Sequence, residues 1–138
     1  MKGQYLTIEY LLFFIIGVVL VTSVYFIFSN VNSIAERNTV ISQLNSVGEL
    51  IRGTIINVYQ VSYRTESDII YNLSIPPKLA SCIYTINATT NLNLNCTHDK
   101  SIGVSLSLYN LNITTRNIIY STKGYVEINA LNQTVELK

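Results

Sequence analysis

The chain has 138 residues, enough for one ordinary domain, and it carries a formal net charge of +1 with only 12% charged residues. This composition excludes a broadly basic surface for nucleic acids and a broadly acidic surface for cations. Apolar residues make up 49% of the sequence and are concentrated near its start. The N-terminal part therefore differs in character from the rest.

The segment Tyr10–Phe28 contains nineteen residues and no charge. Its only small or polar interruptions are Gly17, Thr22 and Ser23. At about 1.5 Å rise per residue, a helix of this length spans roughly the ~30 Å hydrocarbon core of a bilayer. An ordinary secretory signal has a shorter apolar region, about 7 to 15 residues, followed by an Ala-x-Ala-like cleavage site. Because Ser29–Ser33 shows no such pattern, removal of the whole segment is not expected.

Glu9 lies at the start of the apolar run, between Ile8 and Tyr10. A carboxylate in hydrocarbon costs at least about 2.5 kcal/mol at a helix centre and less near the interface. One interpretation leaves Glu9 solvated at the headgroup level, where the helix dipole favours negative charge in a first turn. The other gives it a cationic partner once the helix leaves the lipid. The sequence leaves both open.

The helical period continues beyond Phe28. Apolar residues recur three or four positions apart, at Val31, Ile34, Ala35, Val40, Ile41, Leu44, Val47, Leu50 or Ile51, and Ile55. No proline occurs before position 76, and isolated glycines cost roughly 1 kcal/mol each without ending a long helix. The pattern predicts one helix from about Tyr5 to Tyr59, amphipathic in its second half. Such a helix requires either lipid or copies of the chain to cover it.

Beyond Tyr59 the period changes to two. Short alternating segments rich in β-branched and aromatic residues are separated by turn residues: VSYR, IIYNLSI, CIYTINAT, NLNLNC, VSLSLY, ITTRNIIYS, GYVEINAL and TVELK. Seven or eight strands at this spacing are typical of a small sandwich or barrel. The sequence therefore predicts an α+β protein, with a long N-terminal helix, a boundary near Tyr59–Thr65 and a small antiparallel β-sandwich head.

Two cysteines, Cys82 and Cys96, lie in the predicted head. Two buried free thiols are one interpretation, but a pair of cysteines in a small exported module favours a disulfide. The segment SCIYTINATTNLNLNC indicates two strands about a polar turn near Thr89 and Thr90, which sets the cysteines opposite one another. Closing a loop of this size contributes about 3 kcal/mol in the chain-entropy model.

Asn-x-Ser/Thr sequons occur five times, all after position 70, at Asn72, Asn87, Asn95, Asn112 and Asn132. Chance alone gives some sequons in a chain rich in Asn, Ser and Thr. Their confinement to the distal half fits a glycosylated outer face. N-glycosylation of the head is therefore predicted, with these five residues as candidates.

The titratable residues predict no catalytic site. A general base built on His98, the single histidine, with Asp99 beside it is disfavoured because adjacent strand or turn residues point apart. Cys96 has a disulfide partner, which argues against a nucleophile. Two cysteines and one histidine are too few for a closed metal site, and the sequence contains no phosphate-binding loop. No enzyme activity, cofactor or metal is expected.

The residues before the apolar run resemble the class III signal peptides of archaeal type IV pilin-like proteins; they are Lys2, Gly3, Gln4, Thr7 and Glu9. In that family a membrane aspartic peptidase removes a short positive leader ending in Gly, before the hydrophobic helix rather than after it. The resemblance implies cleavage between Gly3 and Gln4. Family members often carry the acidic residue at the fifth mature position, whereas Glu9 would be the sixth.

The resemblance implies a lollipop-like pilin with a leader over residues 1–3, a helix over 4–59 and a head over 60–138. The helix would wait as a membrane span and then join the core of a bundle of identical copies, and contacts that do not close give a filament. The residues implied in assembly are Glu9, Tyr10, Leu11 and Leu12. The implied partners are membrane lipid, a prepilin peptidase, an assembly ATPase with its platform, and further copies of the chain.

Two other classes of protein remain open. A membrane-anchored accessory subunit of a motility, secretion or surface-binding machine would share the helix and head but form no main filament. The discriminating feature is the amphipathic stretch after Phe28, which needs a repeated partner in a filament, whereas an anchor needs only a linker. An anchored extracellular enzyme is the third class, and the small set of titratable groups argues against it.

Overall fold

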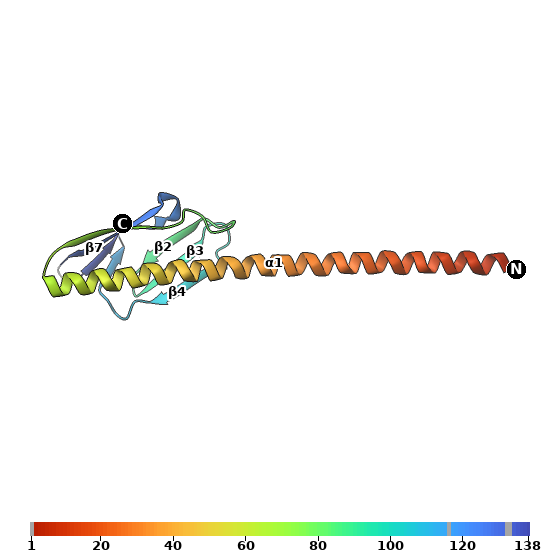
Figure 1. The fold of residues 1–138 in the computed structure, drawn as a ribbon, viewed down its shortest axis with the longest axis horizontal. Helices are drawn as coiled ribbons and strands as arrows, with labels where there is room; N and C mark the ends of the chain where they lie inside the picture. The colour runs from red at the N-terminus through yellow and green to blue at the C-terminus, as the bar shows by residue number, and fades with distance from the viewer. Residues whose placement is uncertain (1, 116, 132–133) are drawn as a thin grey trace. The chain divides into compact units, whose positions relative to one another are not determined.

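The computed structural model describes residues 2–115, 117–131 and 134–138, with side chains described from Ile8 onward. The fold is α+β, as predicted: a long N-terminal helix, α1 (Lys2–Thr65), precedes a small β head (Figure 1). The chain divides into two compact units, one up to Arg37 and one over Asn38–Lys138. The described part of the first unit is helical throughout, and the second unit contains the remainder of α1 and the strands.

Eight strands follow α1 in the described ranges: β1 (Ile69–Ser74), β2 (Tyr84–Ala88), β3 (Asn91–Cys96), β4 (Gly103–Ser107), β5 (Ile113–Thr115), β6 (Ile119–Tyr120), β7 (Tyr125–Leu131) and β8 (Thr134–Leu137). A 3-10 turn, η1 (Ser121–Lys123), separates β6 from β7. The strands form two four-stranded sheets, ordered β1-β7-β8-β5 and β4-β3-β2-β6. The number of strands agrees with the seven or eight predicted.

The described strand pairs are antiparallel except for one. β5 runs parallel to β8, with Ile113 opposite Val135 and Thr115 opposite Leu137. Parallel neighbours need a long connection, and here β6 and β7 lie between the two strands in the sequence. The prediction of an antiparallel head is therefore correct apart from this edge.

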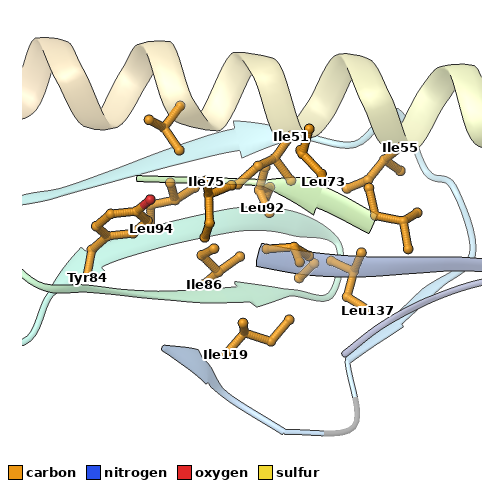
Figure 2. Close-up of a cluster of buried hydrophobic side chains, with 14 of the residues drawn as sticks. Ile51, Ile55, Leu73, Ile75, Tyr84, Ile86, Leu92, Leu94, Ile119 and Leu137 are labelled. Atoms are coloured by element: carbon orange, nitrogen blue, oxygen red, sulfur yellow. The ribbon is translucent and has the colours of Figure 1, made fainter. Parts of the chain in front are cut away.

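One face of α1 is buried in the second unit, through Val40, Leu44, Val47, Ile51, Ile55 and Val58. These residues belong to a single hydrophobic core that also takes residues from both sheets. Figure 2 shows Ile51 and Ile55 pointing from the helix toward the strands, with Leu73 and Leu92 beneath them. Burial of each large aliphatic side chain contributes roughly 1.5–3 kcal/mol. This packing holds the second half of α1 against the head.

The packing corrects the expectation that the amphipathic stretch needs lipid or other copies of the chain. Its apolar side is covered by the chain's own β head, with Ile51 buried and Leu50 exposed. Gly48 approaches the head so closely that a Cβ there would lie 2.7 Å from Leu106 Cδ1 and 3.3 Å from Leu94 Cδ1. The missing side chain at this position lets α1 lie close to β3 and β4.

The helix ends at Thr65, beyond the predicted end near Tyr59, so the prediction of a strand at VSYR (61–64) is wrong. The rings of Tyr59 and Tyr63, one turn apart on α1, stack with centroids 6.2 Å apart. The buried Ser62 hydroxyl donates to the Ser67 carbonyl oxygen over 2.8 Å. These contacts favour a helix at residues 61–64. The alternating pattern there covers only four residues and is too short to specify a strand.

A threonine hydroxyl joins the two sheets at the end of β2. β6 pairs only with Thr85 and Ile86, so the last residue of β2, Ala88, lies beyond its reach. The Thr115 hydroxyl of β5 accepts the Ala88 N–H over 2.9 Å and donates to the Ala88 carbonyl oxygen. The side chain thereby replaces a missing strand partner, as buried backbone groups require.

Two polar side chains are satisfied inside the core. Tyr84 is fully buried, and its hydroxyl donates to the Pro76 carbonyl oxygen over 2.8 Å. Burial raises the pKa of Tyr84 to about 12, because loss of water disfavours the phenolate. Ser121 is also fully buried and contacts both the backbone N–H of Tyr84 and the carbonyl oxygen of Pro77. The loop containing both prolines is thereby tied to β2 and η1.

Candidate functional site

The N-terminal unit exposes a continuous apolar surface. Every large hydrophobic side chain from Ile8 to Ile34 is exposed. Among the described residues, α1 is the one helix long and apolar enough to cross a membrane. The residues implied in assembly are all exposed on it: Glu9, Tyr10, Leu11 and Leu12. Gly3 and Gln4, the implied cleavage site, lie within the backbone of α1, and the side chain of Gln4 is outside the described part of the structure.

Polar side chains within this surface bond to the helix itself. The Thr22 hydroxyl donates to the Val18 carbonyl oxygen and the Ser23 hydroxyl to the Val19 carbonyl oxygen, each over 2.7 Å. Bonds of this kind, four residues back, remove the need for water. Since an unpaired polar group in an apolar medium costs several kcal/mol, these bonds suit the segment to lipid or a dry protein interior.

Four of the five sequon asparagines are described, and all four are exposed: Asn72, Asn87, Asn95 and Asn112. Asn132 lies outside the described residues. Asn87 and Asn95 share one sheet face, because Asn87 lies opposite Asn93 and Asn95 opposite Thr85. Exposure leaves room for a glycan at each described position, and glycan attachment stays a prediction.

The outward face shared by β2, β3 and β4 carries amide and hydroxyl groups and no charge. Its side chains are Thr85, Asn87, Asn91, Asn93, Asn95, Ser105 and Ser107. The alternate residues of β2 and β3 are buried on the opposite face. This sheet therefore presents a neutral, hydrogen-bonding surface outward and an apolar one inward.

Cys82 and Cys96 form a disulfide, with their Cα atoms 5.7 Å apart, as predicted. The register differs from the expected one, since Cys96 lies opposite Tyr84. Cys82 precedes β2 and pairs with Leu79 through two backbone hydrogen bonds of 2.7 and 2.9 Å. The disulfide thus joins the end of β3 to the turn that leads into β2.

The remaining candidates for chemistry are exposed residues in a turn. His98 and Asp99 follow β3, and the Asp99 carboxylate accepts the Ser101 N–H over 2.9 Å. This bond gives the carboxylate a role in the turn. Across the described ranges, no group of three or more His, Cys, Asp and Glu residues is placed to hold a metal ion.

A pocket of about 420 Å³ lies beside β6, lined by Asn117, Ile118, Ile119, Tyr120, Lys123 and Lys138. No sequence motif identifies these residues as a site. Lys123 lies in η1 and Lys138 follows β8, and no local pattern brings the two together. Gly124, with a left-handed φ of 77°, turns the chain from η1 into β7.

Compared with models of known protein families, with curated proteins and with solved structures, the chain has no match. Its function is therefore inferred from its own residues. Three surface features are candidates for function: the exposed apolar half of α1, the uncharged outer sheet face and the pocket beside β6.

Proposed function

We propose that the chain is a pilin, the structural subunit of an archaeal type IV pilus that serves surface adhesion or cell contact. The observation that carries the proposal is the contrast along α1. From Val40 to Val58 the helix buries one face in the core of the head, whereas from Ile8 to Ile34 its large apolar side chains are exposed. The exposed half of α1 therefore needs an apolar environment that the head of the same chain does not provide.

Water cannot be the lasting environment of this half. Removing one large apolar side chain from water is favourable by roughly 1.5–3 kcal/mol of free energy. This contribution applies to each such side chain along the segment. Lipid and a bundle of identical helices are both apolar environments. The same segment therefore suits a membrane-inserted subunit before assembly and a filament core afterwards.

The N-terminal residues support a proteolytic cleavage that leaves this helix in the mature protein. Lys2 and Gly3 match the family's short positive leader, and cleavage before Gln4 leaves the apolar run in the mature subunit. Glu9 then enters the filament core, where its carboxylate requires a cationic partner. We assign that role to the new N-terminal amine of a neighbouring copy. A prepilin peptidase, an assembly ATPase and its platform are the partners of this pathway.

The head suits the outer wall of such a filament. Its disulfide is typical of a protein exposed to an oxidising environment. The four described sequon asparagines are exposed, and together with the uncharged sheet face they favour a hydrated, glycan-bearing surface. The proposed glycan acceptors are Asn72, Asn87, Asn95, Asn112 and Asn132.

A second function is favoured by one observation. The chain's own head covers α1 from Val40 onward, so this stretch does not require a repeated partner. A pilin-like accessory subunit that stays in the membrane would satisfy the remaining apolar half with lipid alone. The two functions differ in whether the chain forms filaments.

Two measurements on native cells test the proposal. Mass spectrometry of the mature protein should find Gln4 as the first residue, and a mature chain that starts at Met1 or after Phe28 would contradict the processing step. Negative-stain microscopy of sheared surface material should show filaments that contain the chain. Filaments that lack it, with the chain retained in the membrane, would favour the accessory subunit.

A matched pair of variants separates processing from folding. Gly3→Arg places a bulky charge at the cleavage site and should leave the leader attached and abolish filaments. Gly3→Ala keeps a small residue there and should retain both. Normal filaments from Gly3→Arg would refute the proposed cleavage site.

A further inference from the structure

The pocket beside β6 has an apolar and aromatic wall. Ile119 is buried and lies opposite Ile86 of β2, so the residues on either side of it point the other way. Ile118 and Tyr120 are accordingly exposed by 56% and 53%. Both line the pocket. Half-exposed apolar and aromatic side chains in a concave surface can pack against the carbon-bearing face of a ligand ring.

Two ammonium groups line the same pocket. Lys123 Nζ lies 4.3 Å from the centroid of the Tyr125 ring, which holds it in place through a cation–π contact. Lys138 Nζ lies 3.3 Å from Glu136 Oε2. Because an ammonium group has three N–H donors, each lysine can donate to a ligand oxygen while it keeps its contact with the protein.

The charged side chains that line the pocket are lysines. Its described lining contains two lysines and no carboxylate side chain, and Glu136 beside it offsets one charge. Asn117 adds an amide that both donates and accepts hydrogen bonds. In a chain with nine Lys and Arg residues and a net charge of +1, two lysines at one pocket are a local concentration of positive charge.

We propose that this pocket binds an acidic saccharide, a sugar ring that carries a carboxylate. The Tyr120 ring and Ile118 cover the carbon-bearing face of the sugar, Lys123 and Lys138 bind the carboxylate, and Asn117 bonds to hydroxyl groups. A volume of about 420 Å³ admits one or two sugar rings. The site gives the head a specific ligand, and it stands whether or not the chain forms filaments.

Each part of the pocket argues against a simpler ligand. An inorganic anion would use the lysines and leave the exposed faces of Tyr120 and Ile118 without a role. A neutral sugar would use those faces but would offer no negative charge to the ammonium groups of Lys123 and Lys138. The acidic saccharide uses both, and the two simpler ligands serve as comparisons in the test.

The test is a ligand-observed NMR titration of the full chain in detergent micelles. The probes are methyl glucuronide, which has both the ring and the charge, methyl glucoside, which has the ring alone, and acetate, which has the charge alone. We expect methyl glucuronide to bind with a Kd on the order of 1 mM, at least about tenfold tighter than either comparison. Binding of methyl glucuronide no tighter than methyl glucoside or acetate would overturn the proposal.

Surface variants assign the binding to the pocket. Lys123→Met and Lys138→Met should each weaken methyl glucuronide binding about five- to tenfold, and Tyr120→Ser should weaken it by a similar factor. Lys100→Met and Tyr109→Ser make the same chemical changes at exposed residues that do not line the pocket, and should change nothing. Near-ultraviolet circular dichroism checks that each variant is folded. Equal losses in the pocket variants and in these controls would also overturn the assignment.

Discussion

The Ser121 hydroxyl donates a hydrogen bond to the Pro77 carbonyl oxygen over 2.7 Å, across 44 residues of sequence. The oxygen of this hydroxyl also accepts a hydrogen bond from the Tyr84 N–H over 3.1 Å, and Ser121 is fully buried. One hydroxyl therefore satisfies a donor and an acceptor from two different segments. It connects η1, the proline-containing loop and the start of β2 at a point where strand pairing does not.

Removal of the Ser121 hydroxyl should lower the free energy of unfolding. Ser121→Ala leaves the Tyr84 N–H and the Pro77 carbonyl oxygen unpaired, at about 1–3 kcal/mol for a buried group. We expect the free energy of unfolding to fall by about 2–4 kcal/mol, measured by urea denaturation of the full chain in micelles. Ser105→Ala, on the exposed face of β4, should change it by less than about 0.5 kcal/mol. Similar losses in both variants would argue against the role given to Ser121.

The two glycines in the second half of α1 should respond in opposite directions to the same substitution. A Cβ at Gly48 meets Leu106 and Leu94, whereas a Cβ at Gly53 meets nothing within 4 Å. Gly53→Leu should raise the free energy of unfolding by about 0.5–1 kcal/mol through helix propensity. Gly48→Leu should lower it by about 1–3 kcal/mol through overpacking. A gain at both positions would show that the helix does not depend on close approach at Gly48.

Local periodicity predicts much of this fold, because it reports which side of an element is buried. The spacing of Val40, Leu44 and Ile55 identified one face of α1, and that face is the buried one. The change to a period of two identified the segments that form the strands. Periodicity does not report what covers a face. The pattern alone therefore predicts a need for lipid or other copies of the chain, whereas the head of the same chain covers this face.

Features that depend on distant residues were not predictable in the same way. The parallel pairing of β5 with β8 and the meeting of Lys123 with Lys138 arise from the order of strands across two sheets. The cysteine pair was predictable because the turn at Thr89 and Thr90 is local, yet the register that sets Cys96 opposite Tyr84 was not. The segment VSYR is helical although its residues alternate, because an alternation of four residues is too short to specify a strand.

Loss of the disulfide should destabilise the head. Cys82 and Cys96 are 14 residues apart, and a loop of this size contributes about 3 kcal/mol in the chain-entropy model. The double variant with Cys82→Ala and Cys96→Ala should lose about this free energy of unfolding, as should the unmodified chain in reductant. The double variant itself should be insensitive to reductant, which is the internal control. An unchanged urea midpoint after complete reduction would contradict the prediction.

Stability should fall at high pH because of Tyr84. Burial raises the pKa of Tyr84 to about 12, while a tyrosine in the unfolded chain titrates near 10. Between these values the unfolded chain releases a proton that the folded chain retains, so the free energy of unfolding decreases as pH rises. This contribution is fully present below pH ~10 and is lost as pH rises through ~12. Two pKa units correspond to roughly 2–3 kcal/mol.

Tyr84→Phe isolates this contribution. The variant loses the hydrogen bond to the Pro76 carbonyl oxygen, so it should be less stable than the unmodified chain at pH ~9 by about 1 kcal/mol or more. Groups that the two proteins share contribute equally to both stabilities, and their effects cancel in the difference between the two. That difference should shrink as pH rises from ~9 to ~12, because the variant has no phenol to ionise at this position. Parallel urea-derived stability curves over this range would show that the burial of Tyr84 does not govern the loss.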